Sequence, residues 1–174
     1  MPVDEAPRSD TSLGGRLAVW VATGLGVGLV TPAPGTIGGL WGIPLVLAVA
    51  KLPHLWMQAA VVAALVLAAV FVCDKAARAL GSSGDPQAVA LDEIAVLPIV
   101  FLGAPPLTWK VLLAGLLLFR LFDIWKPGMV REVEKLPGGW GVVADDVAAA
   151  ALAWATLRGM FWLEGALGVE WFAA

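Results

Sequence analysis

The sequence predicts an all-α integral membrane protein, a helical bundle with about four or five membrane segments. Of its 174 residues, 60% are apolar and 14% are charged, whereas soluble domains carry about 25% charged residues. Its clearest apolar runs approach the roughly 20 residues that a helix needs to cross a bilayer. Residues 1–12 are polar and lack the pattern of a signal peptide. We therefore expect a disordered tail there and a single membrane-embedded domain over residues 13–174.

In the first half of the chain, the predicted elements are apolar runs whose boundaries are set by proline, glycine or charged residues. Leu17–Leu29 contains three glycines and predicts an interfacial or half-inserted helix, whereas the two prolines of Thr31–Thr36 exclude regular helix. A short apolar helix over Ile37–Ala50 follows, and Lys51–His54 predicts a turn. Leu55–Cys73 is uninterrupted and predicts the first clear span.

The second half contains the remaining predicted spans. Gly81–Gly84 predicts a loop, and Pro86–Leu102 predicts a helix because Pro86 suits a first helical turn. Leu107–Trp125 is the second clear span, and Lys126–Gly141 is a polar loop. Val142–Leu163 is the last span, with an acidic pair in its predicted first turn, where a helix N-terminus favours negative charge.

Several residue types limit the possible chemistry. Cys73 is the only cysteine and His54 the only histidine, which excludes an intramolecular disulfide, a cysteine metal cluster and catalysis by a histidine pair. The net charge of −3 is too small to indicate an acidic or a basic partner, and no basic stripe suggests a nucleic-acid partner. Of the nine tryptophans, several fall near predicted segment ends, which favours an interfacial belt over scattered core positions. These are Trp41, Trp56, Trp109 and Trp162.

Basic residues are distributed unevenly between the two predicted faces. If each long segment crosses, most of them fall on one face, and the positive-inside rule places that face in the cytoplasm. The same face gathers all the acidic clusters. The richer face holds Arg8, Arg16, Lys75, Arg78, Arg120, Lys126, Arg131 and Lys135, and the poorer face holds Lys51 and Lys110.

Three acidic clusters interrupt the apolar sequence. They are Asp85 with Asp92 and Glu93, then Asp123, then Asp145 and Asp146. A carboxylate inserted near the bilayer costs about 3 kcal/mol, so five would cost roughly 15 kcal/mol, as much as the whole stability of a typical domain. Water at the membrane face or a bound divalent cation offsets such a cost. Either solution places the function at these carboxylates.

Basic side chains accompany the acidic ones. Arg120 and Asp123 are three residues apart on one helical face, and Asp123 and Lys126 repeat that spacing. A guanidinium fork and an ammonium charge beside Mg²⁺-binding carboxylates suit a phosphate group. The alternatives are a structural Arg120–Asp123 ion pair and acidic pairs that serve as exposed helix caps. Pro34–Thr36 either offers backbone N–H groups and a hydroxyl to a phosphate or forms a simple tight turn.

Four motifs in a fixed order carry a resemblance to a known family. They are Gly26-x-Gly28 with Ala33-Pro34-Gly35-Thr36, Asp85-Pro86-x₅-Asp92-Glu93, Phe119-Arg120-x-Phe122-Asp123-Ile124-x-Lys126-Pro127, and Gly138-Gly139-x-Gly141-x₃-Asp145-Asp146. With these motifs, the chain from about Gly24 to Ala151 resembles phosphatidylglycerophosphatase A, a bacterial membrane phosphatase. Each motif alone would be weak, but the four together are specific.

The resemblance implies a multi-pass enzyme of the bacterial cytoplasmic (inner) membrane, with its active site facing the cytoplasm. Such enzymes remove the terminal phosphate of phosphatidylglycerophosphate in a Mg²⁺-dependent reaction that gives phosphatidylglycerol. Two routes stay open, a metal-activated water and direct attack by an aspartate. The implied metal ligands and catalytic groups are Asp92, Glu93, Asp123, Asp145 and Asp146, with Asp123 also a candidate base or orienter of Arg120. The implied substrate-binding residues are Arg120, Lys126, Thr36, Gly35 and Asp85.

Two other function classes compete with a phosphatase. A small cation transporter or channel would use the carboxylates to line an ion path, and polar residues would then recur through the membrane depth. Here they gather on one predicted face, which disfavours a path. A non-catalytic membrane subunit whose acidic residues bind a partner would show no dependence on a metal ion.

Overall fold

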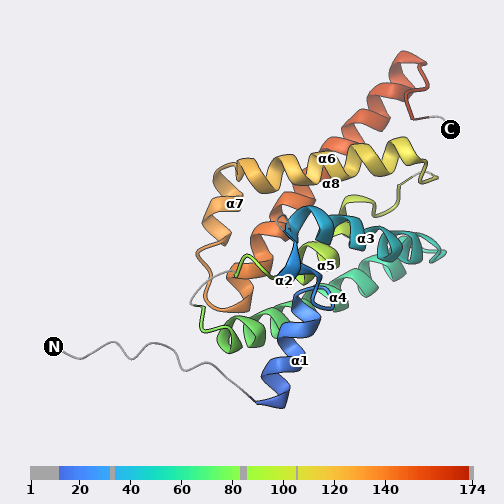
Figure 1. Cartoon of the computed structure of the whole chain (residues 1–174). Coiled ribbons are helices and arrows are strands. Elements are labelled where there is room, and N and C mark those ends of the chain that lie inside the picture. Colours follow the sequence, from blue (N-terminus) through green and yellow to red (C-terminus); the bar gives the residue numbers. More distant parts are fainter. Residues whose placement is uncertain (1–11, 32–33, 83–85, 105, 173–174) are drawn as a thin grey trace.

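The computed structural model describes residues 12–31, 34–82, 86–104 and 106–172, and within these ranges all regular structure is helical (Figure 1). The described helices are α1 (Leu13–Ala22), α2 (Val27–Val30), α3 (Pro34–Ala50), α4 (Leu55–Ala79), α5 (Leu91–Val100), α6 (Trp109–Trp125), α7 (Gly128–Val133) and α8 (Gly139–Leu167). Most of the predicted N-terminal tail lies outside the described residues. Its last residue, Ser12, accepts a hydrogen bond from the Gly15 N–H and so caps α1.

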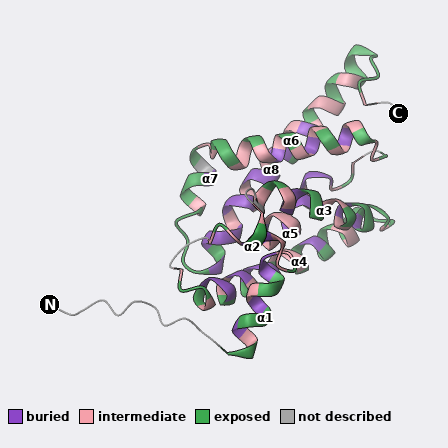
Figure 2. Cartoon of the chain, viewed as in Figure 1, coloured by how far each residue is buried: buried purple, intermediate pink, exposed green. Residues whose placement is uncertain are grey.

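The short helix α5 lies at the centre of the bundle. It packs against α3, α4 and α8, and α8 also packs against α6 and α7. The buried residues concentrate on these inward faces (Figure 2), and most of them are Ala and Val, with Phe119 and Leu97 the largest fully buried side chains. Small residues let helix backbones approach closely, which is how helices pack where lipid replaces water outside.

Two helices, α4 and α8, are long and apolar enough to cross a membrane. The most apolar window of α4 has a mean hydropathy of 2.4, yet only 17% of it is buried inside the bundle. Its apolar side chains therefore face outward. The helices α1 and α3 are apolar but shorter. The all-helical prediction is confirmed, and two of the four or five predicted spans have helices of sufficient length.

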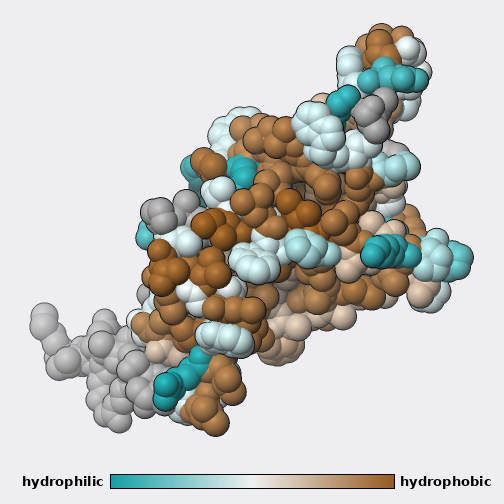
Figure 3. Space-filling view, turned by 45° about the vertical axis from the view of Figure 1, so that its right-hand side comes forward, coloured by the Kyte–Doolittle hydropathy of each residue, from teal (hydrophilic) through white to brown (hydrophobic). Residues whose placement is uncertain are grey.

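The outer surface is apolar to an extent unusual for a soluble protein. Figure 3 shows hydrophobic residues over most of the visible face, with hydrophilic groups mainly near its edges. All nine tryptophans are at least 40% exposed, so they do not form the core. They are Trp20, Trp41, Trp56, Trp109, Trp125, Trp140, Trp154, Trp162 and Trp171. This placement agrees with tryptophans at a membrane interface.

The predicted interfacial helix over Leu17–Leu29 is broken in two. α1 ends at Ala22, and Gly24, Leu25 and Gly26 all have positive φ before α2 begins. Glycine adopts this left-handed region readily, and the Thr23 hydroxyl accepts the Gly26 N–H at 3.2 Å. Two of the glycines in the predicted interfacial or half-inserted helix therefore form a turn instead.

Other boundaries differ from the predictions. α4 extends to Ala79, beyond Cys73, where the predicted span ends. The helix predicted from Pro86 begins only at Leu91, because the Ala90 N–H donates to Ala22 O at 2.8 Å in a link to the end of α1. The predicted loop Lys126–Gly141 contains α7 and the first residues of α8. α6 ends at Trp125, as predicted.

Long-range hydrogen bonds define two ends of the bundle. At the acidic end, the Gly139 N–H donates to Asp74 Oδ1 at 3.1 Å, which joins the end of α4 to the start of α8. At the opposite end, the Gly103 N–H donates to Gln58 Oε1 at 3.0 Å, and the Thr108 hydroxyl donates to Phe172 O at 3.0 Å. The predicted site residues within the described ranges lie at the acidic end.

Candidate active site

A cluster of three carboxylates lies between α6 and α8. Oxygen atoms of Asp123, Asp145 and Asp146 lie within 4.8 Å of one another. Asp145 and Asp146 are only 6% and 5% exposed. Placing three carboxylates this close in a buried position costs free energy unless a cation or strong hydrogen bonds compensate.

The second acidic pair approaches this cluster from α5. Asp92 and Glu93 occupy the first turn of α5, and Asp92 is only 4% exposed. Asp92 Oδ1 accepts the Glu93 N–H at 2.9 Å. The charges of both residues act on Asp146, together with those of Asp123 and Asp145. Five predicted carboxylates from three helices therefore converge at one end of the bundle.

Arg120 connects the α5 pair to the α6 carboxylate. Its Nη1 atom donates to Glu93 Oε1 at 2.8 Å and to Asp123 Oδ2 at 2.9 Å. The ion pair with Asp123 therefore forms, as the three-residue spacing allows. Glu93 lies against this guanidinium and outside the three-carboxylate cluster, so a metal-ligand role for Glu93 stays a prediction, as it does for Asp92.

The start of α3 lies directly against this ion pair. A Cβ atom on Gly35 would overlap Glu93 Oε1 and would lie 3.1 Å from Arg120 Nη2. Only glycine leaves room for the ion pair here, and it brings the α3 N-terminus to the site. Thr36 is exposed beside it. Asp85, the remaining predicted substrate-binding residue, lies outside the described residues.

Lys126 reaches the cluster because α6 ends abruptly. Lys126 has a φ of 44° and a ψ of 63°, the left-handed conformation, and is followed by Pro127. Such a conformation is strained for a residue other than glycine and tends to occur at functional sites. Its Nζ atom donates to Asp145 Oδ2 at 2.7 Å and pairs with Glu134 Oε1 at 3.1 Å. The unwinding expected near Pro127 does turn Lys126 inward.

The environment keeps Lys126 cationic. Burial lowers its pKa, but hydrogen bonds and charge attraction from Asp145 and Glu134 outweigh burial and raise the pKa well above its usual value. Lys126 therefore supplies a permanent positive charge beside Asp145.

Two functional contacts have little signal in the sequence. Asp74 accepts the Gly139 N–H and pairs with Arg78, so it caps α8 from the neighbouring helix α4. Glu134, in the predicted polar loop, is the second partner of Lys126.

α8 begins at Gly139, which places Asp145 and Asp146 in its second turn rather than in the predicted first turn. The prediction that a helix N-terminus stabilises this pair is therefore wrong.

The carboxylate cluster suits a hard divalent cation. The Oδ1 atom of Asp145 is buried and accepts no hydrogen bond within the described structure. An unpaired buried carboxylate oxygen is costly, and a cation would satisfy it. Mg²⁺ prefers one or two carboxylates and completes its shell with water and phosphate oxygens. Asp123, Asp145 and Asp146 offer such donors, with Arg120 and Lys126 beside them for a phosphate.

The chain is similar to a group of named phosphatases. A family model described as phosphatidylglycerophosphatase A matches residues 20–161. A phosphatidylglycerophosphatase A from Haemophilus influenzae is 37% identical over 134 residues, which cover 76% of this chain and 82% of that protein. One from Escherichia coli is 31% identical over 134 residues, which cover 76% of each chain.

A third relative has a different name. A protein from Bacteroides thetaiotaomicron, provisionally named a phosphatidylinositol-3-phosphatase, is 35% identical over 157 residues, which cover 86% of this chain and 96% of that protein. No solved structure matches the chain significantly.

Proposed function

Because the chain belongs to the phosphatidylglycerophosphatase A family, we propose that it hydrolyses phosphatidylglycerophosphate to phosphatidylglycerol and inorganic phosphate. In this reaction water adds to phosphorus, the ester P–O bond breaks, and the departing glycerol oxygen takes a proton. The observation that carries the proposal is the convergence of Asp123, Asp145 and Asp146 within 4.8 Å, next to Arg120.

The carboxylates are suited to hold Mg²⁺. Asp123, Asp145 and Asp146 would supply the ligands, and the buried Oδ1 of Asp145 is the strongest single indication of a missing partner. Bound there, Mg²⁺ would act as a Lewis acid that polarises the phosphate and lowers the pKa of an attacking water. Asp92 and Glu93 would add negative charge and hold Arg120 in place.

The phosphate would bind on the Arg120 side of the cluster. Within the described residues, both ion pairs of Arg120 use Nη1, and both of its terminal nitrogens lie close to Gly35 at the start of α3. The guanidinium and the N-terminus of α3 are therefore neighbours. Helix N-termini and guanidinium groups both favour phosphate oxygens. Lys126, held by Asp145, would add a second positive charge.

The apolar exterior supports a site at the membrane surface. The acidic end of the bundle would face the cytoplasm of a bacterial cell, with α4 and α8 as spans and α1 and α3 contributing shorter apolar segments. Exposed tryptophans and leucines would contact lipid. This position would let a membrane lipid present its phosphate to the site without leaving the bilayer.

One experiment separates the two substrates that the relatives suggest. We would measure phosphate release by the purified protein from phosphatidylglycerophosphate and from phosphatidylinositol-3-phosphate, each with Mg²⁺ and with a chelator. The proposal predicts Mg²⁺-dependent release that is faster from phosphatidylglycerophosphate. Faster release from phosphatidylinositol-3-phosphate would show that this chain prefers the substrate for which the Bacteroides relative is named. No release from either lipid would reject phosphatase activity.

A further inference from the structure

We propose that Glu134 is a positioning residue that keeps the Lys126 ammonium group on the phosphate side of the site while Asp145 serves as a metal ligand. The inference rests on the proposed function, because that proposal assigns the substrate phosphate to Arg120 and Lys126. Glu134 would not contact the substrate itself. Its effect on the substrate would pass through Lys126.

The Lys126 ammonium group pairs with one buried and one half-exposed carboxylate. Lys126 Nζ lies 2.7 Å from Oδ2 of the buried Asp145 and 3.1 Å from Oε1 of Glu134, whose side chain is 46% exposed. Asp145 belongs to the three-carboxylate cluster, whereas Glu134 lies outside it. The two partners can therefore have different roles, and mutation of Glu134 leaves the proposed metal ligands in place.

Metal ligation by Asp145 would weaken its contact with Lys126. A divalent cation on that carboxylate would offset its negative charge and would repel the neighbouring ammonium group. Lysine carries its charge at the end of a flexible chain, so the Lys126 side chain would be free to turn toward water. The contact with Glu134 would persist, because Glu134 lies outside the cluster, and it would hold the ammonium group beside the site.

The backbone around Glu134 is fixed by its packing against α8. α7 packs on α8, and the Val130 side chain of α7 is fully buried. The Glu134 N–H donates to Val130 O at 3.3 Å. A Cβ on Gly141 would lie 2.9 Å from Glu134 O and would overlap Leu136 O. Glycine at position 141, in the fourth sequence motif, therefore lets this segment approach α8 closely, and a fixed backbone is what a positioning residue needs.

A neighbouring ion pair provides a matched control for Glu134. Lys135 Nζ lies 2.7 Å from Glu132 Oε1, and these two side chains are 65% and 69% exposed. Ion pairs with this exposure contribute little to stability. Glu132→Gln makes the same change as Glu134→Gln two residues away, so it should leave phosphate binding unchanged.

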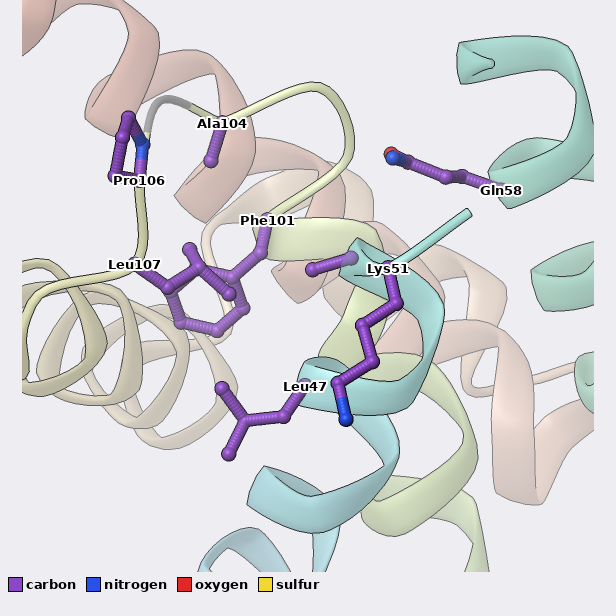
Figure 4. A pocket seen from close by; sticks show the side chains of 8 residues that line it. Leu47, Lys51, Gln58, Phe101, Ala104, Pro106 and Leu107 are labelled. Carbon is purple, nitrogen blue, oxygen red and sulfur yellow. The ribbon is translucent and has the colours of Figure 1, made fainter. Parts of the chain in front are cut away.

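Lys51 provides a matched control for Lys126. It lines a cavity of about 520 Å³ beside Gln58, at the end of the bundle opposite the acidic site (Figure 4). Among the described residues that line this cavity, none is acidic. Lys51→Met removes the same charge as Lys126→Met without affecting the carboxylate cluster, so it should also leave phosphate binding unchanged.

The test is a double-mutant cycle on the binding of a non-hydrolysable phosphonate analogue of phosphatidylglycerophosphate in saturating Mg²⁺. We expect Glu134→Gln to weaken binding about tenfold and Lys126→Met to weaken it about 30-fold. Adding Glu134→Gln to Lys126→Met should change the affinity by less than about twofold, because Glu134 acts through Lys126. In hydrolysis, Glu134→Gln should mainly raise KM, since the phosphate is charged before and during the reaction. Thermal unfolding confirms that each variant is folded.

Glu134→Ala is the second variant, and it should weaken binding at least as much because it also removes the hydrogen-bond acceptor. Unchanged or tighter binding in both Glu134 variants, or equal weakening with and without Lys126, would overturn the positioning role. Coupled weakening of analogue binding without any hydrolysis by the wild type would reject the proposed activity and keep the positioning role. Hydrolysis by the wild type without coupling would keep the activity and reject the role. A wild type that does not bind the analogue would reject both.

Discussion

Replacing Arg120 with lysine separates phosphate binding from charge balance. In the structure, Arg120 Nη1 pairs with Glu93 and Asp123, which are 12% and 15% exposed, while Nη2 lies beside Gly35. Lysine keeps the positive charge between the two carboxylates, so we expect the free energy of unfolding to change by less than about 1 kcal/mol. Lysine lacks the planar fork that serves both the carboxylates and a phosphate.

We expect Arg120→Lys to lower the catalytic rate rather than the stability of the protein. A hydrogen bond to a charged group contributes about 1.5–3 kcal/mol. Losing one such contact to the phosphate in the transition state costs about 2 kcal/mol, which is about 30-fold in kcat/KM. Arg120→Ala should behave differently, because it leaves two partly buried carboxylates without their cation. Removing one partner of a buried ion pair costs about 3–5 kcal/mol, so this variant should also unfold more easily.

The assay is phosphate release over a range of substrate concentrations, together with thermal unfolding in detergent. Arg131→Lys is a matched control, because Arg131 is exposed at the end of α7 and should tolerate the change in both measurements. Normal turnover by Arg120→Lys, combined with simple unfolding of Arg120→Ala, would refute the reasoning. Arg120 would then be a structural cation, and the phosphate would depend on metal, Lys126 and backbone N–H groups.

Three further variants test other parts of the site. Asp145→Asn should lower phosphate release by about 100-fold or more while thermal stability stays equal or rises, because it removes one of several crowded negative charges; near-normal turnover would mean that Asp145 is not a ligand. Gly35→Ala should lower kcat/KM by roughly tenfold, because its Cβ would displace Glu93, whereas Gly159→Ala has open space and should be active. Asp74→Ala should destabilise the protein by about 1 kcal/mol in chemical unfolding, as loss of a helix cap does, and an unchanged midpoint would exclude that capping role.

The sequence was sufficient to predict the parts of the fold that depend on local pattern. The turn at Lys51–His54 and the end of α6 at Trp125 are both set by proline and charge next to an apolar run. The inward turn of Lys126 also follows from a local cause, because Pro127 prevents α6 from continuing. The gathering of the acidic clusters at one end could be inferred from alternation of the segments.

The remaining features depend on tertiary contacts that no local pattern contains. α8 begins earlier than predicted because Asp74, 65 residues away, accepts the Gly139 N–H. α5 begins later than predicted because the N–H of Ala90, the residue before it, donates to Ala22 O at the end of α1. The sequence also could not show that Glu93 is the residue that pairs with Arg120. Its neighbour Asp92 has the same sequence context, and Asp92 Oδ1 accepts the Glu93 N–H. The need for glycine at position 35 becomes clear only in the structure, where Glu93 of α5 and Arg120 of α6 occupy the space that a Cβ would fill.

The central claim is that the buried carboxylates of α6 and α8 bind a divalent cation, and direct binding tests it without relying on activity. Calorimetric titration of Mg²⁺ into the purified protein and into Asp145→Asn would compare their affinities, with thermal unfolding to confirm that both are folded. The structure predicts saturable binding to the wild type that weakens about tenfold or more in Asp145→Asn. Equal affinity in the two proteins would contradict the claim, as would phosphate release that persists in the presence of a chelator.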